Sequence, residues 1–138
     1  MDIRRIASIA SIVLGALMII AAGATWLMVS SELKDQKIVT PDDACLAGRD
    51  VKGPFTAYCQ AEIIDDHARE ATGGKTYAEL PQDDPLRDTA MQASFLRASL
   101  YTSVVAFGVA AMSAAMGVLF ILIGLGMRDV RDRLSPAP

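Results

Sequence analysis

The segment IASIASIVLGALMIIAAGATWLMV, residues 6–29, contains no charged side chain in 24 positions. A second uncharged run, ASLYTSVVAFGVAAMSAAMGVLFILIGLGM, covers the 30 positions of residues 98–127. About 20 apolar residues in a helix cross the hydrocarbon core of a bilayer. Both runs are therefore long enough to span a membrane, whereas a soluble domain spreads its apolar residues over shorter periodic runs.

The 138-residue chain has room for one folding unit, and its polar residues gather between the two apolar runs. This arrangement predicts an all-α membrane protein: an antiparallel two-helix transmembrane hairpin with a small helical, disulfide-pinned extracytoplasmic segment. The expected parts are a cytoplasmic N-terminus (1–5), a first span (6–29), an extracytoplasmic loop (30–93), a second span (94–127) whose helix starts near residue 85, and a cytoplasmic tail (128–138).

The first run also has features of a secretory signal. Arg4 and Arg5 would be its positive start, and Ala22-Gly23-Ala24 satisfies the small-x-small cleavage rule. The apolar run continues past that point to Val29. We therefore expect an uncleaved anchor.

Charge near the span ends predicts the orientation, because cytoplasmic flanks carry an excess of Lys and Arg. Arginines precede the first span and follow the second, whereas residues 30–97 hold eight basic against thirteen acidic residues, a net charge of −5. We expect a plasma-membrane protein with both termini in the cytoplasm. Trp26 and Tyr101 then fall near the outer interface, where amphipathic rings prefer to lie.

Cys45 and Cys59 are the only cysteines, and both lie in the expected exported loop. In an oxidising compartment such a pair predicts a disulfide. The alternative is two free thiols. A zinc site is disfavoured because zinc takes four ligands and His67 is the only histidine.

The stretch Gly73-Gly74-Lys75-Thr76 resembles the end of a phosphate-binding P-loop. The motif needs a further glycine at position 69, which is Arg69, and a preceding strand. We expect the glycines to end a helix that begins at Gly53-Pro54. The helical pattern of apolar residues along that segment comprises Phe55, Tyr58, Cys59, Ile63, Ile64 and Ala68.

A set of mostly small residues recurs along both spans at alternating steps of three and four, which is the pattern of a helix-packing seam. In the first span the positions are Ser8, Ser11, Gly15, Met18, Ala22 and Thr25; in the second they are Ser103, Ala106, Ala110, Ser113, Gly117, Phe120, Gly124 and Met127. The two seams can face each other. Further stripes of small residues, at 7, 11 and 15 and at 106, 110 and 114, suggest more packing surface than one hairpin uses.

Two strings, GPFTAYCQAEIIDDHAREATGGKTYAEL (53–80) and DPLRDTAMQASFLRASLYTSVVAFGVAAM (84–112), resemble small membrane proteins of actinobacteria. Members of that family often carry the label aromatic ring-opening dioxygenase, of the LigA type. The resemblance implies two spans in an actinobacterial plasma membrane. Enzymes that open aromatic rings with Fe(II) bind the metal with two histidines and a carboxylate. His67 is the only histidine here, so no site residue can be carried over.

The sequence leaves three functional hypotheses. The preferred one is a non-enzymatic structural or accessory membrane protein that binds lipid and either other membrane subunits or copies of itself. It uses no cofactor, metal, nucleotide or nucleic acid. The second is a homo-oligomeric channel lined by Ser8, Ser11, Ser103 and Ser113. The third, disfavoured, is an enzyme with Glu62, Asp66 and His67 as its site. Neither span core holds an ionisable residue, which argues against ion-coupled transport.

Overall fold

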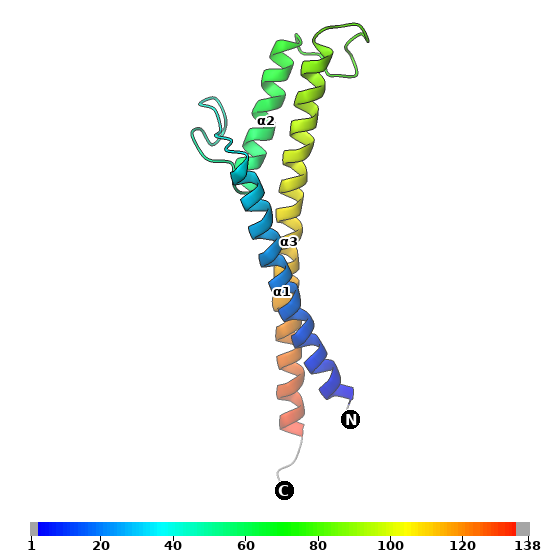
Figure 1. Cartoon of the computed structure of the whole chain (residues 1–138). Helices are drawn as coiled ribbons and strands as arrows, with labels where there is room; N and C mark the ends of the chain where they lie inside the picture. The colour runs from blue at the N-terminus through cyan, green and yellow to red at the C-terminus, as the bar shows by residue number, and fades with distance from the viewer. Residues whose placement is uncertain (1–2, 135–138) are drawn as a thin grey trace. The chain divides into compact units, whose positions relative to one another are not determined.

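The structure, a computed structural model, describes residues 3–134. Within that range the chain forms three helices, α1 (Ile3–Asp35), α2 (Pro54–Ala71) and α3 (Arg87–Leu134) (Figure 1). The β-type pairing in this range is an isolated antiparallel bridge between Val39 and Asp50. The all-helical class expected from the sequence is confirmed, and the expected end segments 1–5 and 128–138 lie partly outside the described residues.

The chain divides into two compact units. The paired-helix unit comprises residues 1–27 and 108–138, and the central unit comprises residues 28–107. Each of the long helices α1 and α3 contributes residues to both units. The central unit also contains α2 and the two loops that flank it.

Helix α1 ends later than the apolar run does. The polar residues 30–35 continue the helix to Asp35, and Leu33 in this extension is buried in the core of the central unit. The chain then turns at Lys37, whose positive φ of 52° places it in the left-handed region. The helix therefore extends beyond the apolar run, and its last turns carry Leu33 into that core.

Helix α2 has the boundaries that its flanking residues favour. Pro54 occupies the first turn, and the Thr56 hydroxyl accepts the backbone N–H of Gly53 at 3.2 Å. At the other end, Gly73 and Gly74 have φ values of 65° and 86°, a region that glycine enters without steric cost. The Gly74 N–H donates to the Arg69 carbonyl at 2.7 Å, which satisfies a carbonyl of the last helical turn.

Helix α3 starts beside the expected Asp-Pro signal. The Asp84 carboxylate accepts the Leu86 N–H at 2.9 Å, and the Arg87 N–H donates to the Asp84 carbonyl at 3.0 Å. These bonds satisfy donors that a helix start leaves without intrahelical partners. From Arg87 the helix continues without interruption to Leu134.

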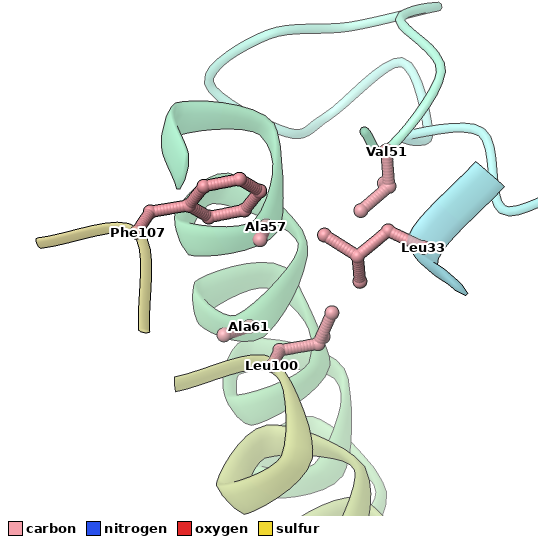
Figure 2. Close-up of a cluster of buried hydrophobic side chains, with 6 residues drawn as sticks. All are labelled: Leu33, Val51, Ala57, Ala61, Leu100 and Phe107. Carbon is pink, nitrogen blue, oxygen red and sulfur yellow. The ribbon is translucent and has the colours of Figure 1, made fainter. Parts of the chain in front are cut away.

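The core of the central unit gathers side chains from all three helices and one loop (Figure 2). Its members are Leu33 of α1, Val51 of the loop before α2, Ala57 and Ala61 of α2, and Leu100 and Phe107 of α3. The two alanines are completely buried, and Phe107 is 1% exposed. The alanines leave room for the larger side chains of the neighbouring segments, so small residues form the contact face of α2.

This core corrects one expectation. Phe55 and Tyr58 were expected on the apolar face of α2, yet their exposed fractions are 78% and 46%. The buried positions of α2 are Ala57, Cys59, Ala61 and Ile63. The physical reason is that Ala57 and Ala61 make the close contact with the neighbouring segments, and the two aromatic rings stand at other positions of the helix that stay exposed.

The loop between α1 and α2 folds around Thr40, which is 1% exposed. The Thr40 hydroxyl accepts the Arg49 N–H at 3.0 Å, and the Thr40 carbonyl accepts the Gly48 N–H at 2.9 Å. The Val51 N–H donates to the Ile38 carbonyl at 2.9 Å. These bonds satisfy the polar groups that the loop buries.

Candidate functional site: the seam between the long helices

The seam of the paired-helix unit is the candidate functional site. In α1 the buried or half-buried positions include Ser8, Ser11, Gly15, Met18, Ala22 and Thr25. In α3 of the same unit they include Ala110, Ser113, Gly117, Phe120, Gly124 and Met127. The remaining two expected packing residues, Ser103 and Ala106, are half-buried and belong to the central unit.

Three glycines let the two helices approach each other closely. A Cβ atom added to Gly15 would lie 2.4 Å from the carbonyl oxygen of Gly117, and one added to Gly117 would lie 2.7 Å from the carbonyl oxygen of Gly15. A Cβ on Gly124 would lie 2.8 Å from the carbonyl oxygen of Ser8. These carbonyl oxygens belong to the backbone, so no side-chain rotation relieves the overlaps with them.

Two serine hydroxyls bind across the seam. Ser8 Oγ donates to the Gly124 carbonyl at 2.7 Å, and Ser11 Oγ donates to the Phe120 carbonyl at 2.8 Å. In the sequence, Ser8 and Ser11 are expected as small packing residues or, in the channel hypothesis, as pore-lining hydroxyls, and their spacing does not show which carbonyl they reach. Hydrogen bonds of this kind between apolar helices contribute about 0.6–2 kcal/mol each.

The contacts pair the two helices in opposite chain order. Ser8 contacts Gly124, and Gly15 lies against Gly117. The contact position thus moves forward along α1 as it moves backward along α3. Isoleucine side chains complete the seam, since the Cγ1 atoms of Ile19 and Ile121 are the nearest side-chain atoms to Gly117 and Gly15. These isoleucines were absent from the expected set because the spacing argument selected small residues.

Away from the seam, the paired-helix unit exposes large apolar side chains. In α1 they include Leu17 at 58% and Ile20 at 67%, and in α3 they include Met112 at 61% and Leu122 at 60%. The most apolar 18-residue windows of α1 and α3 have mean hydropathies of 2.4 and 2.3, and only 17% of each window is buried inside the protein. By length and composition, both helices could cross a membrane.

Three other glycines lie on this outer surface. An added Cβ at Gly23, Gly108 or Gly126 meets no atom within 4 Å. Glycine in a helix is less favourable than alanine by about 1 kcal/mol, and nothing inside the chain requires it at these positions. By contrast, the stripes at 7, 11 and 15 and at 106, 110 and 114 contain Gly15 and Ala110, both of which are buried.

The central unit carries a polar cluster where α2 meets α3. The Asp65 carboxylate accepts hydrogen bonds from Arg69 at 2.9 Å and from Arg97 at 2.7 Å. The Tyr101 hydroxyl donates to Glu62, and the Arg97 guanidinium lies 5.7 Å from the centre of the Tyr101 ring. Tyr101 therefore has protein partners. Trp26, the other expected interfacial ring, is 39% exposed in the paired-helix unit.

A small cavity lies beside this cluster. Its volume is about 70 Å³, and its charged lining consists of Asp65, Arg69, Lys75 and Arg97. The Arg97 Nε is buried and has no hydrogen-bond acceptor among the described residues. The Asp65–Arg69 pair could be predicted from sequence spacing, because the two residues are four positions apart in one helix. The Asp65–Arg97 pair could not, because these residues are 32 positions apart in the chain.

His67 forms a contact outside the expected catalytic set. Its Nε2 lies 2.6 Å from Asp43 Oδ2 in the loop before α2. The hydrogen bond that His67 donates to the Asp43 carboxylate raises the pKa of His67 and lowers the pKa of Asp43. Glu62 instead accepts from Tyr101. Between residues 3 and 134, no group of three metal-ligating side chains comes together.

Cys45 and Cys59 lie at disulfide distance, with their Cα atoms 5.5 Å apart. The expected pairing is thus present in the structure. It joins the loop after α1 to a buried position of α2. A crosslink that closes a loop of this length stabilises the folded state by about 3 kcal/mol in the chain-entropy model.

No protein-family model, curated protein or solved structure matches this chain.

Proposed function

We propose that the chain is a non-enzymatic integral membrane protein that serves as an accessory subunit of a larger membrane complex or as a self-associating scaffold. The observation that carries the proposal is the outer surface of the paired-helix unit. Large apolar side chains and three glycines lie there without neighbours from the same chain to cover them. Such apolar exposure is costly in water and favourable in lipid.

The proposed topology is an antiparallel transmembrane hairpin. The opposite chain order of the seam contacts supports antiparallel spans, and the arginines at both outer flanks support cytoplasmic termini. The disulfide supports an exported central segment, because disulfides persist in oxidising compartments. On this basis the protein belongs in the plasma membrane of its cell.

The outer glycines support a binding partner within the membrane. Small residues on a lipid-exposed helix allow a further helix to approach its backbone, as Gly15 and Gly117 do inside the seam. Gly23 lies on α1, whereas Gly108 and Gly126 lie on α3, so each helix offers an approach site. The partner helices come from other subunits or from copies of this chain.

The channel hypothesis is less favoured. A pore lined by Ser8 and Ser11 requires their hydroxyls to face water, whereas both donate to carbonyls of α3. The enzyme hypothesis is also less favoured, because Glu62 and His67 bind different partners and therefore do not converge on one reacting atom.

The test is native mass spectrometry of the tagged protein purified from its own membrane in a gentle detergent. The proposal expects either a stoichiometric set of foreign subunits or a defined homo-oligomer. Replacing Gly108 or Gly126 with leucine should reduce that assembly while leaving the hairpin folded. A protein that is monomeric at every concentration, or an assembly indifferent to both substitutions, would contradict the proposal.

A further inference from the structure

The paired-helix unit contains a cleft of about 440 Å³ at the end where α1 begins. Its lining comprises Arg5, Ser8, Ile9 and Ile12 of α1 and Arg128 of α3. The two arginines approach the cleft from different helices. The lining thus combines cationic groups with apolar side chains.

The arginines are available to bind a ligand. Neither Arg5 nor Arg128 forms an ion pair with any residue that the structure describes, and both side chains are exposed. A guanidinium group is planar and matches the oxygens of a phosphate with paired hydrogen bonds. Two such groups from neighbouring helices favour a phosphate over a single carboxylate, because a phosphate has enough oxygens to meet both.

The depth of the residues matches the layers of a membrane. Ser8 contacts Gly124, so these two residues lie at one level, and Arg5 and Arg128 are three and four residues from it. At 1.5 Å per residue, the arginines lie roughly 4.5 and 6 Å outside the Ser8–Gly124 level. The polar headgroup layer of one leaflet is about 5–8 Å thick. With the arginines at headgroup level, Ile9 and Ile12 therefore lie in the hydrocarbon.

We propose that this cleft binds an anionic phospholipid, with the phosphate between Arg5 and Arg128 and an acyl chain along Ile9 and Ile12. The inference rests on the proposed membrane insertion and names a ligand for it. Basic pockets between spans on the cytoplasmic side bind anionic head groups. Ile9, whose side chain is 53% exposed, supplies the apolar contact that a free phosphate would not use.

The test compares lipids that share acyl chains and differ in head group. Phosphatidylglycerol and phosphatidylcholine are titrated onto the full-length protein in a neutral detergent, and native mass spectrometry gives the two apparent affinities. We expect tighter binding of phosphatidylglycerol. Arg5→Gln and Arg128→Gln should each weaken it about fivefold, which corresponds to about 1 kcal/mol per arginine near a membrane surface.

Arg4→Gln is the matched control, because Arg4 neighbours Arg5 but does not line the cleft. We expect it to change phosphatidylglycerol binding less than twofold, and Arg5→Lys to retain more binding than Arg5→Gln. Equal binding of the two lipids, or equal effects of Arg4→Gln and Arg5→Gln, would overturn the inference. Competition by glycerol 3-phosphate at the affinity of the lipid would assign the cleft to soluble phosphates instead.

Carbonate extraction of the membranes separates this inference from the proposed function. A protein released by carbonate is not integral, so both proposals fail. A protein retained in the membrane fraction that shows no lipid preference refutes only the lipid site.

Discussion

The seam makes a quantitative prediction for two glycines of the same helix. Gly117→Ala places a methyl group 2.7 Å from the carbonyl oxygen of Gly15, about 0.7 Å inside the ordinary contact distance of 3.4 Å. Gly126→Ala meets nothing within 4 Å. Both substitutions gain about 1 kcal/mol of helix propensity. The difference between the unfolding free energies of the two variants therefore isolates the steric overlap at Gly117. We expect this overlap to cost about 1–3 kcal/mol, the usual range for overpacking.

The assay is unfolding in mixed micelles, in which increasing fractions of dodecyl sulfate separate the two helices. The fluorescence of Trp26, the only tryptophan, reports the transition because the residue lies in the paired-helix unit. We expect Gly117→Ala to unfold at a lower detergent fraction than the parent and Gly126→Ala at the same or a slightly higher fraction. Coincident transitions for the two variants would refute the close approach of the helices at Gly117.

The central unit gives three further predictions. Cys59→Ser should lower its unfolding free energy by about 3 kcal/mol, measured by thermal circular dichroism; an unchanged melting profile would show that the crosslink contributes nothing. Asp65→Asn should cost about 1–3 kcal/mol in the same assay, because it weakens the charge-assisted bond from the partly buried Arg97, and a neutral effect would contradict this role. The His67–Asp43 pair should stabilise the fold between the usual pKa of Asp43 and that of His67. Its contribution fades as pH rises through the raised pKa of His67 or falls through the lowered pKa of Asp43. An NMR titration of the single histidine checks this, and Asp43→Asn should return the His67 pKa toward its usual value.

Local sequence patterns were sufficient to predict the helices and the three- and four-residue spacing of the seam positions. Pro54 and Gly73 mark the limits of α2 because each acts through its own backbone dihedral angles. Proline has a fixed φ that suits the first helical turn, and glycine adopts the positive φ that follows the last turn. The steps of three and four along the spans follow from helical geometry. The sequence therefore predicted features whose causes lie within a few residues, such as the limits of α2 and the helical spacing along α1 and α3.

Contacts between distant residues were not predictable in the same way. His67 reaches Asp43 and Arg97 reaches Asp65 because of how α2 packs in the central unit, and no local spacing encodes these pairs. The exposure of Phe55 shows the same limit, since burial depends on how closely a neighbouring segment approaches. For the same reason, the sequence alone could not distinguish the seam glycine Gly15 from the outer glycine Gly23.

Paired reporters test the proposed membrane hairpin, whose central segment we place outside the cytoplasm. Green fluorescent protein is fused after Pro138, and in a second fusion alkaline phosphatase is inserted between Gly73 and Gly74. We expect a fluorescent C-terminal fusion and an active phosphatase, because the first reporter matures in the cytoplasm and the second in an oxidising compartment. An inactive phosphatase at the loop position, at normal expression, would contradict the hairpin.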